Sequence, residues 1–147
     1  IERRQNWKCR QRERYKRAIA AIQDAGITVN GCFVLGLDGT DGKSFGEVFD
    51  FVRETGLYEV QITVMTAFPG TSLRARLEKD GRLLSFDAWE LCTLFDVNYM
   101  PDRMSVAELE DGFRSLISRL YKKDFVSERR RRYFDRQREL REASCLR

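Results

Sequence analysis

The sequence has no histidine, only two prolines and four cysteines in 147 residues, and no long hydrophobic run. Without histidine the chain lacks the commonest general base and metal ligand, which excludes Ser-His and Cys-His nucleophiles. No apolar stretch approaches the roughly 18 residues that cross a bilayer, and the first residues form no apolar signal region. These absences leave few means for hydrolytic chemistry and predict a cytoplasmic protein that does not contact a membrane.

The four cysteines lie too far apart to form the close pairs that build zinc or iron-sulfur sites, and a secreted disulfide framework is not indicated. They are Cys9, Cys32, Cys92 and Cys145. Cys32 and Cys92 lie in apolar segments, and we predict that they are small core residues. Cys9 and Cys145 lie in charged segments and have no predicted role. A metal site made from scattered cysteines is the weaker alternative, so no metal ligand is assigned.

The composition that remains is that of a globular domain. Apolar residues make up 42% of the chain, and its length suits one domain with a real core. The first residue is isoleucine, and we expect the chain to be part of a longer protein.

The first predicted unit is a helix followed by a strand. Apolar residues at helical spacing predict a helix with one buried stripe that ends at Gly26. Residues 27–37 are then expected to form a strand, and because residues 32–37 alternate little, we expect both of its faces to be covered. The stripe consists of Tyr15, Ala18, Ile19 and Ile22.

A second unit of the same kind follows about thirty residues later. Ser44 and Glu47 predict a capping box at the start of a helix that ends at Gly56. The next strand, residues 57–67, alternates aliphatic residues with a mixed set that could face a site. The aliphatic residues are Val60, Ile62 and Val64, and the mixed set is Gln61, Thr63 and Met65, whose individual roles stay open.

Two helix-glycine-strand units in succession predict an α/β fold with two parallel strands joined by a right-handed crossover helix. Two strands leave both edges unpaired and are too few for a stable open sheet. We therefore expect a partial (β/α) barrel whose missing strands lie upstream or come from a second copy. The expected division is a partial barrel segment over residues 1–84 and a helical C-terminal extension over residues 85–147 packed on it.

Beyond Thr71 the pattern becomes helical. A short helix is expected to end near Gly81, and another over residues 87–95 would place Trp89 in the core. Ser105 and Glu108 predict a capping box before a long helix with an apolar stripe. That stripe consists of Leu109, Phe113, Leu116, Ile117 and Leu120, and residues 125–147 are expected to form a charged terminal helix.

Both predicted strands end in glycine-rich turns, at residues 36–40 and 66–71. Ligands of barrels and open parallel sheets bind at the carboxyl ends of the strands, so these turns form the candidate site. Val34 shares a strand face with Cys32 and lies near the strand end, where it could lie against a planar ligand. The alternative is a well-packed core strand with a tight turn, because short glycine motifs are weak signals.

The segments from Gly31 to Asp38 and from Thr66 to Leu73 resemble the second half of the barrel in radical S-adenosylmethionine enzymes. The segment from Asn98 to Ser105 is similar to the one that follows the barrel in the cobalamin-associated subgroup, typified by relatives of anaerobic magnesium-protoporphyrin ester cyclase. The likeness covers most of residues 15–121. It implies that the fifth barrel strand touches the adenine of S-adenosylmethionine and that the end of the sixth offers backbone contacts.

The matching positions are Val34 and Gly36 on the fifth strand and Phe68, Pro69, Gly70 and Thr71 at the end of the sixth. The resemblance also implies a [4Fe-4S] cluster and, in this subgroup, cobalamin. The Cys-x-x-x-Cys-x-x-Cys loop that holds the cluster is absent. We therefore expect an inactive C-terminal part of an iron-sulfur oxidoreductase, with no catalytic residue of its own, whose partner is the missing N-terminal half of the barrel.

Two other interpretations stay open. The net charge of +4 and the quartet from Arg129 to Arg132 would suit a nucleic-acid-binding module, as would the aromatic residues near other basic residues, which are Trp7, Tyr15 and Tyr133. Interleaved acidic residues can pair with these arginines on a solvated helix, which disfavours nucleic acid as a partner. Exposed strand edges could instead drive self-association, as in an oligomeric interaction module.

Overall fold

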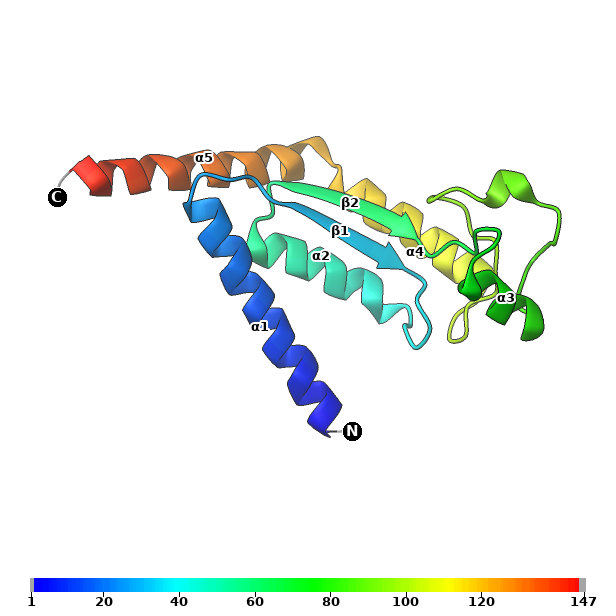
Figure 1. The fold of residues 1–147 in the computed structure, drawn as a ribbon. Helices are drawn as coiled ribbons and strands as arrows, with labels where there is room; N and C mark the ends of the chain where they lie inside the picture. Colours follow the sequence, from blue (N-terminus) through cyan, green and yellow to red (C-terminus); the bar gives the residue numbers. More distant parts are fainter. Residues whose placement is uncertain (1, 146–147) are drawn as a thin grey trace. The chain divides into compact units, whose positions relative to one another are not determined.

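The computed structural model describes residues 2–145, with side chains from residue 11 onward, so the side chains of Trp7 and Cys9 lie outside the described residues. Within this range the structure is mixed α/β, with five α-helices and two parallel strands (Figure 1). The elements are α1 (Glu2–Asp24), β1 (Asn30–Leu35), α2 (Lys43–Thr55), β2 (Glu59–Val64), α3 (Ser72–Lys79), a 3₁₀ turn (Trp89–Leu91), α4 (Val106–Leu120) and α5 (Lys123–Cys145). None of the described helices is long and apolar enough to cross a membrane.

The described chain divides into two compact units. The first consists of residues 2–31, Phe51–Val60 and residues 122–145, and the second of Cys32–Asp50 and Gln61–Tyr121. Both units combine segments that lie far apart in the sequence. The predicted boundary between residues 84 and 85 stays a prediction.

The two strands lie side by side and run in the same direction, with α2 between them in the sequence (Figure 1). Just beyond β2, the Met65 amide donates a hydrogen bond to the Leu35 carbonyl at 2.9 Å. The predicted α/β class with parallel strands is therefore confirmed. The partial barrel stays a prediction.

The strands are covered on one face. Along β2 the aliphatic residues Val60, Ile62 and Val64 are buried, as predicted. Along β1 the burial alternates, since Leu35 is buried whereas Val34 is 49% exposed. The strand is also shorter than the predicted residues 27–37. The expectation of two covered faces is wrong, because no described segment covers the face of Val34.

That open face also corrects the prediction for the cysteines. Cys32 is exposed and Cys92 is half-buried, so Cys32 is not a core residue. Cys145 is exposed as well, and all three are free.

In the second unit, α4 supplies the apolar stripe that its sequence predicts. Leu109, Phe113, Leu116 and Leu120 are buried, and Ile117 is half-buried. The predicted capping box is confirmed: Ser105 Oγ accepts from the Glu108 amide at 3.1 Å, and Glu108 Oε2 accepts from the Ser105 amide at 2.7 Å. The helix therefore starts where local chemistry dictates.

Two other helix predictions need correction. Helix α2 begins at Lys43, and the Ser44 hydroxyl donates to the Asp41 carbonyl at 2.7 Å instead of capping the helix. Residues 87–95 contain only the 3₁₀ turn, and Trp89 is 56% exposed instead of buried. The Trp89 ring lies 5.2 Å from the guanidinium carbon of Arg74, so a surface cation–π contact replaces the predicted core packing.

In the first unit, α1 and α2 end at glycines as predicted, with φ of +83° at Gly26 and +59° at Gly56. The predicted stripe of α1 is not buried, because Tyr15 is 60% and Ile22 is 42% exposed. Helical spacing gives the direction of an apolar face but does not show that a partner covers it.

Helix α5 is attached to the rest of the first unit by its arginines. Arg129 is 2% exposed and donates to the Leu57 carbonyl at 3.1 Å. Arg132 donates to the Arg53 carbonyl at 3.0 Å. Arg136 pairs with Asp24 at 2.9 Å, and this hydrogen bond lowers the pKa of the Asp24 carboxyl below its usual range. These arginines make structural contacts within the fold.

Candidate functional site

The ends of the two strands meet at one edge of the sheet. The hydrogen bond between Met65 and Leu35 joins the last residue of β1 to the first residue beyond β2. Gly36 therefore directly follows Leu35, one partner of this hydrogen bond, and residues 66–71 directly follow Met65, the other partner. Adjacent parallel strands end side by side, so both predicted turns belong to the same edge.

Gly36 is buried and has a φ of +77°, a conformation that side chains rarely adopt. A β-carbon at this position would overlap the Tyr99 hydroxyl and lie 2.8 Å from Leu109 Cδ2. The Tyr99 hydroxyl donates a hydrogen bond to the Gly36 carbonyl. Internal packing thus requires glycine here, whether or not a ligand also approaches.

Tyr99 is fully buried, and burial raises the pKa of its hydroxyl above the ordinary value. Desolvation disfavours the charged phenolate, so the hydroxyl keeps its proton and serves as a donor. It is suited to holding the Gly36 carbonyl and not to acting as a base.

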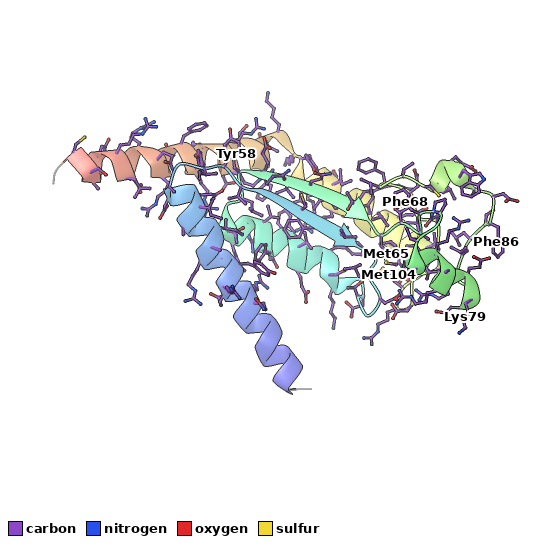
Figure 2. The ribbon with its side chains drawn as sticks, in the orientation of Figure 1. Tyr58, Met65, Phe68, Lys79, Phe86 and Met104 are labelled. Carbon is purple, nitrogen blue, oxygen red and sulfur yellow. The ribbon has the colours of Figure 1, made fainter. Side chains whose placement is uncertain are left out.

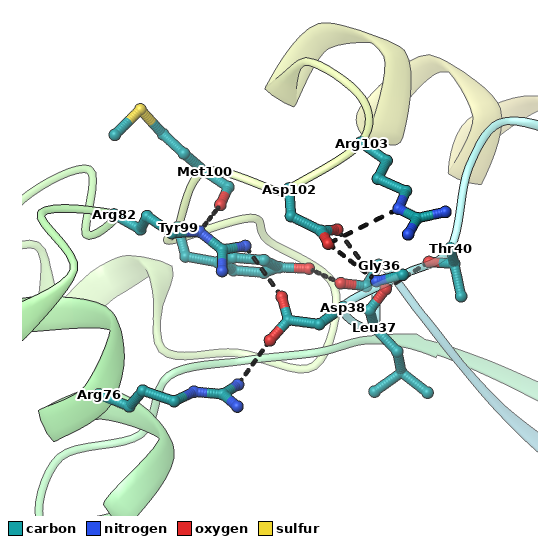
Figure 3. A network of polar contacts seen from close by, with 11 residues as sticks. Gly36, Leu37, Asp38, Thr40, Arg76, Arg82, Tyr99, Met100, Asp102 and Arg103 are labelled. Atoms are coloured by element: carbon teal, nitrogen blue, oxygen red, sulfur yellow. Dashed lines mark hydrogen bonds and ion pairs between the residues drawn. The ribbon is translucent and has the colours of Figure 1, made fainter.

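The loop after Gly36 is held by a network of polar contacts (Figure 3). Asp38 Oδ2 lies 2.7 Å from Arg76 Nη2, and Asp38 Oδ1 lies 3.0 Å from Arg82 Nη2. The Gly39 amide donates to both carboxylate oxygens of Asp102, at 3.1 and 3.0 Å. The loop is thereby connected to α3, to the segment that follows it and to residues 99–102.

The end of β2 is held by a buried amide side chain. Asn98 Oδ1 accepts from the Ala67 amide at 3.0 Å, and Asn98 Nδ2 donates to the Ala67 carbonyl at 3.3 Å. The Thr66 hydroxyl donates to the Thr93 carbonyl at 2.5 Å. Residues 93–98 therefore fix the backbone from which the 68–71 turn leaves.

The 68–71 turn leads into α3. Thr71 is the N-cap, and its hydroxyl accepts from the Arg74 amide at 3.2 Å. Phe68 is 37% exposed, whereas Met65, on the strand side of the turn, is buried (Figure 2). An open cavity of about 470 Å³ borders the turn and is lined by Pro69, Gly70, Thr71, Ser72, Arg74, Ala75, Glu78 and Trp89.

The open strand face carries Val34 beside small and polar residues. Cys32 Sγ lies 3.8 Å from Gln61 Oε1, so these two side chains share that face. Thr63 is half-buried and its hydroxyl donates to the Phe33 carbonyl at 3.4 Å. Gln61 is exposed and Met65 buried, so of the mixed set of β2 Gln61 is the most accessible to a ligand.

The predicted site residues thus fall into two neighbouring groups. Val34 and Gly36 lie at the end of β1, and Phe68, Pro69, Gly70 and Thr71 form the turn after β2. Whether they touch a cofactor stays a prediction. Sequence reasoning did not assign roles to Asp38, Asn98, Tyr99 and Asp102, although all four lie in segments that resemble the family.

The described side chains offer no ligand set for a metal or cluster. Residues 11–145 contain no group of three or more Cys, Asp or Glu side chains that could hold a metal ion. The [4Fe-4S] cluster implied by the resemblance therefore does not fit the side chains of residues 11–145. The edge can bind or orient a ligand through backbone groups and apolar contacts, and it presents no nucleophile paired with a base.

Taken together, fold and edge define a mixed α/β domain whose paired strand ends are held by α3 and by residues 82–102. The chain belongs to the family described as domain of unknown function DUF4070, whose model matches residues 71–145, or 75 of the 147 residues. That range begins at the N-cap of α3 and ends at the last residue of α5.

A curated relative matches a larger part of the chain. It is bacteriochlorophyllide d C-12(1)-methyltransferase from Chlorobaculum tepidum, 25% identical over 117 residues. The match covers 80% of this chain but 25% of the relative. The chain thus spans about a quarter of the length of the curated relative it matches.

Proposed function

We propose that this chain is the C-terminal part of a radical S-adenosylmethionine enzyme, of the cobalamin-associated type that resembles magnesium-protoporphyrin ester cyclase. In this proposal it supplies part of the site for the adenine of S-adenosylmethionine. The similarity to a methyltransferase and the DUF4070 family support a radical S-adenosylmethionine-related domain. The observation that carries the proposal is the junction of the two strand ends through Leu35 and Met65.

That junction brings two different kinds of contact to one edge. Val34 presents an apolar side chain that is 49% exposed on the open strand face. In the 68–71 turn the amides of Phe68 and Thr71 donate to the Thr66 and Phe68 carbonyls, so the contacts to the base are assigned to the Gly70 amide and the Pro69 and Gly70 carbonyls at the end of the neighbouring strand. A flat aromatic base needs an apolar surface for its face and hydrogen-bonding groups for its edge, and this edge offers both.

The remaining chemistry comes from outside this chain. When bound in the whole enzyme, the [4Fe-4S] cluster would supply the electron that cleaves S-adenosylmethionine. The sequence lacks the cysteine loop that holds it, so the proposal assigns the cluster and any cobalamin to other parts of the enzyme. This chain's role is to bind and orient, and its partner is the N-terminal half of the barrel.

Specific contacts favour a structural role for the arginines over the nucleic-acid alternative. Arg129 is buried against the Leu57 carbonyl, and Arg132 donates to the Arg53 carbonyl. Two members of the arginine quartet are thus used within the fold. Phosphate binding needs cations that face outward.

The test is titration of S-adenosylmethionine into the full-length, cluster-reconstituted enzyme and its Val34→Asp variant. A carboxylate placed against the base must be desolvated on binding, so we expect the dissociation constant to rise at least tenfold, about 1.4 kcal/mol. Ile27→Asp is the matched control, because Ile27 is also an exposed aliphatic residue, at 59%, but lies outside the proposed edge. Equal affinity in both variants, or no binding by the wild-type enzyme, would contradict the proposal.

A further inference from the structure

The carboxylate of Asp38 joins three segments at the site edge. Each of its oxygens pairs with a different arginine, Oδ2 with Arg76 at 2.7 Å and Oδ1 with Arg82 at 3.0 Å (Figure 3). Arg76 belongs to α3, and Arg82 follows that helix. Asp38, in the loop after β1, is thus bound at both carboxylate oxygens by two arginines that follow β2 in the sequence.

The arginine partner on the Oδ1 side is itself fixed. Arg82 Nε donates to the Met100 carbonyl at 2.8 Å, and the Arg82 side chain is 20% exposed. The next residue of the loop, Gly39, donates its amide to Asp102. The loop therefore has anchors on residues 99–102 as well as on α3, and Asp38 is its connection to α3.

This connection links the two halves of the proposed site. Gly36 lies two residues before Asp38, and Thr71, the N-cap of α3, lies five residues before Arg76. We propose that Asp38 is a positioning residue that sets the spacing between the Gly36 turn and the 68–71 turn. The inference rests on the proposed function, since it explains how the two predicted contacts with the adenine are held apart by a fixed distance.

Energetics favour this role over a purely stabilising one. Exposed ion pairs typically contribute little to the free energy of unfolding. The side chains of Asp38, Arg76 and Arg82 are 34%, 54% and 20% exposed, so both ion pairs are in contact with solvent and the loss of their charge attraction should leave the protein folded. A loop that samples more positions would instead reduce the fraction of molecules competent to bind, and the dissociation constant rises in inverse proportion to that fraction.

The experiment compares Asp38→Asn, Asp38→Glu and Asp80→Asn in the full-length, cluster-reconstituted enzyme. Asp80 is an exposed aspartate at the C-cap of α3 and serves as the matched control. If Asp38→Asn lowers the fraction of molecules that are competent to bind to about a tenth, the dissociation constant for S-adenosylmethionine rises about tenfold. Asp38→Glu keeps the charge and should recover most of that loss, and Asp80→Asn should match the wild type.

Hydrogen–deuterium exchange without ligand tests the connection separately. Asp38→Asn should speed exchange in peptides that cover residues 36–42 and residues 72–79 together, at an unchanged melting temperature. Unchanged exchange in both peptides, or Asp38→Asn binding as tightly as the wild type, would overturn the positioning role. If the wild-type enzyme binds no S-adenosylmethionine, the proposed function fails, and the exchange data still decide whether Asp38 couples the two turns.

Discussion

At the scale of single residues, the site edge depends on one glycine and one tyrosine that come from distant parts of the chain. Gly36 adopts a φ of +77°, and the Tyr99 hydroxyl donates to its carbonyl. The positive φ could be anticipated from a glycine after an apolar strand. The tyrosine could not, because nothing in the local sequence indicates a contact between residues that lie 63 positions apart.

Gly36→Ala should destabilise the protein more than its backbone conformation alone explains. The left-handed conformation costs an alanine about 1–2 kcal/mol, and overlap with Tyr99 and Leu109 adds about 1–3 kcal/mol. Gly81→Ala is the control, because Gly81 has a φ of +64° and its β-carbon would meet no described atom within 4 Å. Urea unfolding should show the larger loss for Gly36→Ala, and equal losses would contradict the packing described here.

At the scale of elements, α4 carries both the cap and the close contact that fix its place in the second unit. Its capping box was predictable because Ser105 and Glu108 lie within one turn. Its packing was not, since Gly112 meets the ring of Phe45 on α2. The helix that was predicted over residues 87–95 does not form, and Trp89 is exposed, for the same reason. Local apolar spacing does not reveal whether a partner surface exists.

Two glycine-to-alanine substitutions, one on α2 and one on α4, should change the free energy of unfolding in opposite directions. In a helix, Gly→Ala normally stabilises by about 0.5–1 kcal/mol. Gly46→Ala on α2 should show this gain, because its β-carbon would meet no described atom within 4 Å. Gly112→Ala would place a β-carbon 2.7 Å from Phe45 Cδ2 and should cost about 1–3 kcal/mol. Thermal unfolding gives both values, and a stabilised Gly112→Ala would disprove the contact.

The capping box should also give a defined dependence of stability on pH. Hydrogen bonds from the Ser105 amide and hydroxyl lower the pKa of the Glu108 carboxyl. The resulting stabilisation is complete above the ordinary glutamate pKa of about 4.3 and is lost as the pH falls through the lowered value. The urea midpoint of Glu108→Gln should therefore lie below that of the wild type at pH 7 and converge with it in acid.

Ser105→Ala serves as the matched variant for that titration. It removes the hydroxyl, 2.9 Å from Glu108 Oε2, and leaves the amide donor at 2.7 Å. The pH-dependent part of stability should shrink without vanishing. A difference between wild type and Glu108→Gln that stays constant from pH 7 to 3 would mean that the box does not stabilise the charged carboxylate.

At the scale of the whole chain, the order of helices and strands was largely predictable, and the burial of its faces was not. Gly26 and Gly56 end helices as expected because that signal is local. The stripe of α1 and the face of Val34 are exposed, although their sequences suggest cover. Both faces fit the proposal that other parts of a longer enzyme pack on them, since the curated relative is about four times the length of the matched region.

The most direct test of the central claim is hydrogen–deuterium exchange of the full-length, cluster-reconstituted enzyme with and without S-adenosylmethionine. Binding at the proposed edge should slow exchange in peptides that cover residues 32–40 and 66–73 and leave α5 unchanged. If S-adenosylmethionine binds saturably but slows exchange only in other peptides and not in these two segments, the proposed adenine site at this edge is contradicted.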